Sequence, residues 1–167
     1  MTTPIRLGRN REATLRHAYA SYLTEITKDL AALTAAKIEA LSAYDPVGMD
    51  RAVAICYWGR SGSFLLASYL DGHDDVLMLP QSRSQWIYPF LEQFSFLSLR
   101  EKLIAYPDFA EAHDAPFFHG NFAINEMDYY AAVNALFQVH GNLPPEFLDS
   151  RRGFFVFLHV AYSIALN

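Results

Sequence analysis

The sequence predicts an α/β fold in which helices flank a parallel sheet and a long helix precedes it. The main observation is the order of elements in Ala52–Leu79, where an apolar strand, a Gly/Ser turn, a helix and a second strand form a βαβ unit. A second observation is the composition. Hydrophobic residues make up 52% of the 167 residues, which is typical of one globular domain and excludes a disordered chain.

A long amphipathic stripe opens the chain. From Glu12 to Ser42, apolar residues recur three or four positions apart, which predicts one long helix. The proline and glycine of Asp45–Gly48 end it. We therefore expect residues 1–48 to form a helical extension ahead of a domain at residues 49–167. Two roles stay open for the apolar face: packing on the rest of the chain, which Lys37 on the stripe favours, or pairing as a coiled-coil homodimer.

The predicted sheet begins at an uninterrupted apolar run. Ala52–Trp58 is partly β-branched and apolar throughout, which is typical of a strand covered on both faces. Gly59–Ser63 forms a turn, Phe64–Asp71 is predicted to be a helix, and Val76–Leu79 a second strand. A doubly covered strand needs several neighbours, and only one firm partner is found. The sheet is therefore expected to be incomplete at the C-terminus, in a chain that continues beyond Asn167.

Helical patterns dominate the rest of the chain. The predicted helices are Ser84–Phe96, Leu99–Ala105, Glu126–His140 and the apolar run Gly153–Leu166. Asn125 is expected to cap the third of these helices, and a short strand is expected at Pro116–His119. The last run is shorter than the ~20 residues that cross a membrane, so we expect a buried helix and no membrane span.

Charge, cysteine content and the N-terminal sequence exclude several kinds of protein. Thirteen Lys and Arg against eighteen Asp and Glu give a net charge of −5, which argues against a general nucleic-acid-binding surface. Cys56 is the single cysteine, so an internal disulfide and a cysteine-rich zinc site are excluded. The N-terminal arginines are not followed by the apolar stretch of a secretory signal, so we expect a cytoplasmic protein.

The turn after the first strand has the composition of an anion site. Its sequence, Gly-Arg-Ser-Gly-Ser, presents backbone N–H groups at the start of a helix, where the helix dipole favours negative charge. Gly62 lets the main chain approach phosphate oxygens, and Arg60 adds a permanent positive charge. The spacing fits neither the nucleotide-triphosphatase loop nor the dinucleotide fingerprint, and it misses the serine-hydrolase elbow by one position. We therefore expect a phosphate or sulfate ester as ligand.

The segment Ala52–Gln81 resembles the 5′-phosphosulfate-binding segment of sulfotransferases. That family has an apolar strand, then Lys or Arg followed by Ser-Gly-Ser/Thr, a leucine-rich helix, and often Leu-Asp-x-His before a second strand. The matching residues are Arg60, Ser61, Gly62, Ser63, Leu65, Leu66, Leu70, Asp71 and His73. The resemblance implies a P-loop-like sulfotransferase fold, of which this chain is the N-terminal portion.

The resemblance also implies an activity. It implies a transferase that takes 3′-phosphoadenosine 5′-phosphosulfate (PAPS) as sulfuryl donor, needs no metal, and passes the sulfuryl group to a hydroxyl or amine. The residues implied to hold the 5′-phosphate are Ser61, Gly62, Ser63 and Phe64, and Arg60 is implied to lie near the oxygen that bridges phosphorus and sulfur. Negative charge grows on that oxygen as the S–O bond breaks, so a fixed cation there stabilises the transition state. Arg60 is the expected catalytic residue.

Two departures from the family pattern leave parts of the site open. Gln81 stands where similar sulfotransferases have a glutamate as general base, and a glutamine side chain cannot usefully take up a proton. Either His119 or Glu92 serves instead, or the base lies outside these residues, or the match is shifted in register. The family's 3′-phosphate site, an arginine followed later by a serine, has no convincing counterpart before Asn167.

Two other functions stay open. One is a serine hydrolase with Ser61 as its nucleophile. The other is a non-catalytic module that binds anions or oligomerises. His113 and His119 do not have a recognised metal-ligand spacing, so a loop without metal is expected there. The aromatic residues between Trp86 and Phe96 favour a core helix over an acceptor pocket.

Overall fold

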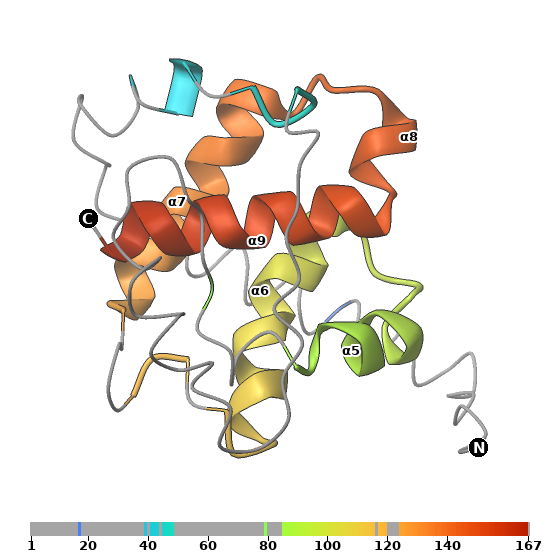
Figure 1. Ribbon diagram of the computed structural model, residues 1–167, viewed down its shortest axis with the longest axis vertical. Coiled ribbons are helices and arrows are strands. Elements are labelled where there is room, and N and C mark those ends of the chain that lie inside the picture. The colour runs from blue at the N-terminus through green and yellow to red at the C-terminus, as the bar shows by residue number, and fades with distance from the viewer. Residues whose placement is uncertain are drawn as a thin grey trace, which may run out of the picture.

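The computed structural model describes residues 17, 39, 41–43, 45–48, 79, 85–115, 117–119 and 124–166. The main helices of this part are α5 (Ile87–Gln93), α6 (Leu99–Glu111), α7 (Glu126–His140), α8 (Pro145–Leu148) and α9 (Arg151–Leu166). Figure 1 shows α9 lying across α6 and α7, with α5 beside α6 and α8 leading into α9. The described residues therefore form a helical bundle around α9.

The predicted α/β architecture is wrong for this part of the chain, in which no residue belongs to a strand or sheet. Leu79, the end of the second predicted strand, is buried outside any strand, and residues 117–119 are bends. The backbone N–H groups of Phe117 and Phe118 donate to the Glu111 carboxylate, so they are not available to pair with a strand. The predicted strand Ala52–Trp58 and the turn and helix after it lie outside the described residues.

The apolar residues of the described region are covered by other helices instead of by a sheet. Phe90 lies 5.2 Å from Tyr106 and 5.7 Å from Phe154 between ring centroids, which joins α5, α6 and α9. Phe117 packs edge-on against Tyr162 of α9 at 5.7 Å. These rings are buried, and edge-to-face and offset pairs of this kind add to the free energy that burial supplies. A bundle of helices thus satisfies the hydrophobic pattern without a parallel sheet.

The predicted helix Glu126–His140 is confirmed, with both ends at the predicted residues. The Asn125 side chain accepts hydrogen bonds from the N–H groups of Met127 and Asp128, so it caps α7 as expected. At the other end, the Gly141 N–H donates to the Phe137 carbonyl at 3.0 Å. Local capping signals were sufficient to define this helix.

The other helix predictions are partly right. The buried C-terminal helix is confirmed, since α9 covers the apolar run and extends two residues before it. Among the described residues, no helix is both long and apolar enough to cross a membrane. The first predicted helix after Pro80 is shorter than expected, because α5 covers only Ile87–Gln93. Phe90 and Phe94 on it are core residues as predicted, whereas Tyr88 is 61% exposed.

The α6 helix extends beyond its predicted end at Ala105 and passes through Pro107. Its start is fixed by a capping box, in which the Ser98 hydroxyl accepts from the Glu101 N–H and the Glu101 carboxylate accepts from the Ser98 N–H. Proline has no N–H to donate to the Leu103 carbonyl, four residues earlier. The Tyr129 hydroxyl of α7 donates to that carbonyl at 2.8 Å. A tertiary contact therefore replaces the missing helical hydrogen bond.

Hydrogen bonds join the bundle to described residues of the N-terminal part of the chain. His140 at the end of α7 donates through Nε2 to the Leu41 carbonyl at 2.9 Å, and Arg152 of α9 donates to the Val47 carbonyl at 2.8 Å. Residues 46–48 form a turn, as their proline and glycine predict, and the Asp45 carboxylate accepts from the Val47 N–H at 3.1 Å.

Candidate functional site

The residues predicted to bind the sulfuryl donor lie outside the described residues. These are Arg60, Ser61, Gly62, Ser63 and Phe64, and Gln81 lies outside them as well. The two candidate general bases, Glu92 and His119, are described. The structure therefore shows the surroundings of both candidate bases, and Glu92 lies in a polar hollow.

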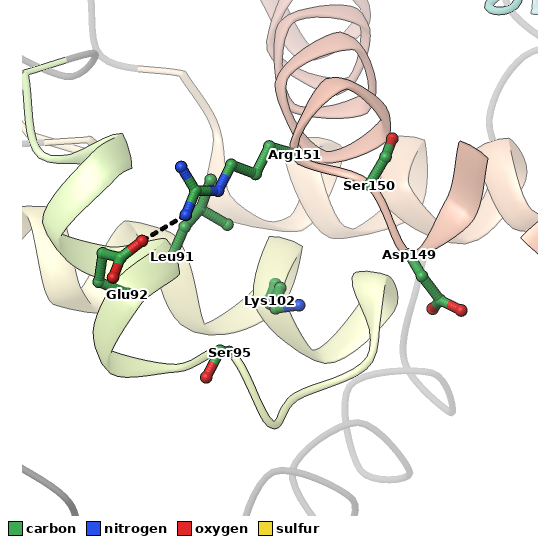
Figure 2. Close-up of a pocket in the computed structure, with 7 residues that line it drawn as sticks. All are labelled: Leu91, Glu92, Ser95, Lys102, Asp149, Ser150 and Arg151. Atoms are coloured by element: carbon green, nitrogen blue, oxygen red, sulfur yellow. Dashed lines mark hydrogen bonds and ion pairs between the residues drawn. The ribbon is translucent and has the colours of Figure 1, made fainter. Parts of the chain in front are cut away.

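The hollow has a volume of about 330 Å³ and lies between α5, the start of α6 and the junction of α8 and α9. Its lining residues are Leu91, Glu92, Ser95, Lys102, Asp149, Ser150 and Arg151 (Figure 2). They comprise two cations, two carboxylates, two hydroxyl groups and a single apolar side chain. The lining suits a small polar ligand better than a lipid tail or an aromatic ring.

The turn from α8 to α9 positions one wall of the hollow. The Ser150 hydroxyl donates to the Phe147 carbonyl at 2.6 Å and accepts from the Gly153 N–H at 2.8 Å, so it ties the two helices together. A Cβ atom at Gly153 would lie 2.2 Å from the Phe147 carbonyl oxygen, too close for any other residue without a backbone shift. Asp149 and Arg151 flank this fixed serine and are thereby held at the edge of the hollow.

Arg151 and Glu92 form a closed pair across one side of the hollow. The Arg151 guanidinium donates to the Glu92 carboxylate (Figure 2). It also lies 5.1 Å from the centre of the Tyr88 ring. Both charged side chains are substantially exposed, so the pair contributes little to stability. Its consequence is local: each charge already has a partner, and an oxygen of the Glu92 carboxylate is occupied by the guanidinium.

Lys102 and Asp149 carry opposite charges on the same hollow without forming an ion pair. Burial lowers the pKa of the Lys102 ammonium, although the carboxylates of Asp149 and Glu101 act in the opposite direction. The lysine is therefore less well compensated by nearby negative charge than its burial requires.

A second polar arrangement forms around Glu111 at the end of α6. One oxygen of its carboxylate accepts hydrogen bonds from the N–H groups of Phe117 and Phe118, at 3.2 and 2.9 Å, and lies 3.1 Å from Nδ1 of His119. Partial burial acts to raise the pKa of Glu111, but these hydrogen bonds and the nearby histidine outweigh it and lower the pKa below its usual value. The carboxylate thus stays ionised and organises the loop that follows α6.

The contact with Glu111 defines which His119 nitrogen can act as a base. An ionised carboxylate only accepts hydrogen bonds, so Nδ1 of a neutral His119 carries the proton and Nε2 holds the free lone pair. The His119 side chain is 79% exposed, so this nitrogen is accessible to a second molecule. A histidine oriented by a carboxylate in this way is suited to accept a proton from a substrate.

His113 does not join His119 in a common site. Its Nδ1 donates to the Phe109 carbonyl at 2.7 Å, and its ring packs against Phe109 and Trp86 at 4.3 and 4.6 Å. In the part of the chain that the structure describes, no three metal-ligating side chains come together. Histidine 113 is a packing residue at the end of α6.

Sequence reasoning missed Glu111, Lys102 and Asp149 as site residues. Glu111 meets His119 across a loop with no repeating pattern, and Lys102 meets Asp149 only because α6 packs near the α8–α9 turn. Neither relationship has a local sequence signal. Comparison with family models, curated proteins and solved structures finds no match for the chain.

Proposed function

We propose that the chain binds PAPS through Arg60–Phe64 and takes part in transferring its sulfuryl group to a hydroxyl or amine acceptor. The observation that carries this proposal is the sequence Ala52–Gln81, in which Arg-Ser-Gly-Ser follows an apolar run and precedes Leu-rich residues and Leu-Asp-x-His. The donor-binding part of the proposal concerns this segment alone.

The chemistry of the segment supports the proposal. The backbone N–H groups and hydroxyls of Ser61–Ser63 match the oxygens of a 5′-phosphate, and Arg60 supplies a cation for the oxygen that bridges phosphorus and sulfur. In the transfer step the bond from sulfur to this oxygen breaks, a bond from sulfur to the acceptor forms, and the acceptor loses a proton. Arg60 stabilises the charge left on the nucleotide, while a separate base takes the proton.

The geometry favours His119 over Glu92 as that base. An oxygen of the Glu92 carboxylate is already occupied by the Arg151 guanidinium. His119 has Glu111 at Nδ1, so its ring is oriented and Nε2 keeps a free lone pair. The Glu111–His119 pair therefore supplies what Gln81 lacks.

Binding of adenosine 3′,5′-bisphosphate, the nucleotide left after transfer, tests the proposal. We expect it to raise the thermal unfolding midpoint of the wild-type chain and of the control Arg51→Ala, but not of Arg60→Ala. Arg51 precedes the apolar run and is no part of the motif. Absence of stabilisation in the wild type, or equal stabilisation of all three proteins, contradicts the proposal. Labelling of Ser61 by a fluorophosphonate would instead identify a serine hydrolase.

A further inference from the structure

Two opposite charges share the hollow of Figure 2 without neutralising each other. The Lys102 ammonium points toward the side of the hollow on which Asp149 lies, and the two groups form no ion pair. Among the described residues, Lys102 and Asp149 form hydrogen bonds through their backbones, and neither side chain has a hydrogen-bond partner. Each therefore retains its full capacity to bind a charged group from outside the chain.

The other polar groups of the hollow are arranged differently. Arg151 and Glu92 are paired with each other, and the Ser150 hydroxyl is used at the α8–α9 turn. Ser95 presents a hydroxyl with no partner in the described part of the chain. The hollow thus offers one cation, one anion and one hydroxyl within walls that are already held in place.

The unpaired lysine adds an energetic reason for a ligand. Burial lowers the pKa of Lys102 in spite of the carboxylates of Asp149 and Glu101, so its charged form lacks sufficient compensation. An anionic group placed beside the ammonium would supply that compensation. A ligand with only a negative charge would at the same time approach Asp149, so a positive charge on the same molecule would add to its affinity.

Size restricts the ligand further. A volume of about 330 Å³ is at the low end of the range for small-molecule pockets, which favours a small ligand. Leu91 is the single apolar residue of the lining, which disfavours an acyl chain or an aromatic ring.

We propose that this hollow binds a small zwitterion, with its anionic oxygens toward Lys102 and Ser95 and its ammonium toward Asp149. The anionic end is a carboxylate, as in a free amino acid, or a phosphate, as in an amino alcohol phosphate. The site does not depend on the proposed donor binding, because none of its residues belongs to the segment Ala52–Gln81.

NMR titration of the isotopically labelled full chain tests the proposal, with L-serine and O-phosphoethanolamine as the two zwitterionic probes. We expect saturable shifts confined to the amides around Ser95, Lys102 and Asp149. A larger affinity for one probe identifies the anionic group as carboxylate or phosphate. Absence of any shift from both probes at about 10 mM, where a millimolar site would be largely filled, contradicts the proposal.

Charge-neutral variants separate recognition of the ligand from a general effect on the hollow. Lys102→Gln and Asp149→Asn should each weaken zwitterion binding about 10-fold or more, the loss expected for one charge-assisted hydrogen bond. Glu146→Gln is the matched control, since this exposed carboxylate lies on α8 but does not line the hollow.

Probes with a single charge then assign each end. Lys102→Gln should leave binding of protonated ethanolamine unchanged, and Asp149→Asn should leave binding of acetate unchanged. If both variants weaken every probe to the same degree, or if Glu146→Gln does so as well, the two side chains do not recognise opposite ends of a ligand and the proposal is wrong.

Discussion

The hydroxyl of Tyr129 donates a hydrogen bond of 2.8 Å to the carbonyl of Leu103, the group that Pro107 leaves without its helical donor. Both side chains are fully buried, so an unpaired carbonyl at this position would be costly. Burial raises the pKa of Tyr129 well above its ordinary value, and Tyr106 adds to that effect, so the phenol keeps its proton and acts as a donor at neutral pH. This contact allows α6 to continue through a proline to Glu111.

Replacement of Tyr129 by phenylalanine should destabilise the fold by about 1–3 kcal/mol, the cost of leaving a buried carbonyl without a donor. The free energy of unfolding, from urea titration followed by circular dichroism, measures this change. Tyr88→Phe is the matched control, because Tyr88 is 61% exposed and should tolerate loss of its hydroxyl with little effect.

A double-mutant cycle with Pro107→Ala tests the physical reason. Alanine restores an N–H four residues after Leu103, so the cost of Tyr129→Phe should be smaller in the Pro107→Ala background. Equal costs in the two backgrounds would show that the hydroxyl stabilises the protein for some other reason.

His159 should make the bundle less stable in mild acid. Its ring is buried in α9, and burial lowers its pKa below 6.5 although the hydrogen bond from Nδ1 to the Phe155 carbonyl acts in the opposite direction. The unfolded chain therefore binds a proton that the folded chain excludes. Stability is full above the ordinary pKa of 6.5 and is lost as the pH falls through the lower, folded value.

Unfolding free energies above and below pH 6.5 check this dependence. His159→Leu removes the titrating group and should flatten the pH profile of stability over this range. His17→Gln should not, because His17 is exposed. If the profile of His159→Leu follows that of the wild type, other groups cause the acid sensitivity.

The two candidate bases should respond differently to substitution. His119→Gln should lower the rate of sulfuryl transfer about 10²–10⁴-fold, the range that general acid–base catalysis supplies, while Glu92→Gln should leave it nearly unchanged. Formation of adenosine 3′,5′-bisphosphate from PAPS, with water or a simple alcohol as acceptor, gives a rate that does not require the natural acceptor. If Glu92→Gln lowers the transfer rate more than His119→Gln does, Glu92 is the general base and the assignment of His119 is wrong.

Arg60 should contribute more to turnover than to nucleotide affinity. Arg60→Ala removes a cation from an oxygen whose charge grows during transfer, so we expect kcat to fall about 10²–10³-fold with a much smaller change in the Kd of adenosine 3′,5′-bisphosphate. Single-turnover formation of this nucleotide from PAPS and equilibrium titration measure the two quantities separately. If kcat and nucleotide affinity fall by the same factor, Arg60 binds the nucleotide but does not stabilise the transition state.

The helices were predictable from the sequence where local signals define their ends. Asn125 and Gly141 determine the limits of α7, and the apolar run before Leu166 defines α9. The end of α6 was not predictable, because its passage through Pro107 depends on Tyr129, which comes from another helix.

The fold class and the polar sites depend on long-range packing. The α/β prediction came from Ala52–Leu79, of which the structure describes only Leu79, whereas the residues after Pro80 were predicted to be mainly helical and their described part is helical. Arg151 lies 59 positions from Glu92, so no local spacing could reveal their pair. The unpaired charges of Lys102 and Asp149 likewise become visible only when α6 meets the α8–α9 turn.

The backbone amides of Ser61, Gly62, Ser63 and Phe64 report most directly on the proposed donor site. Their NMR resonances should shift and saturate as adenosine 3′,5′-bisphosphate is added, because N–H groups that donate to phosphate oxygens change their chemical environment on binding. The same titration of Arg60→Ala should require more nucleotide to reach saturation. Resonances that stay unchanged while the nucleotide binds elsewhere, or does not bind at all, would show that this segment is not the anion site of the protein.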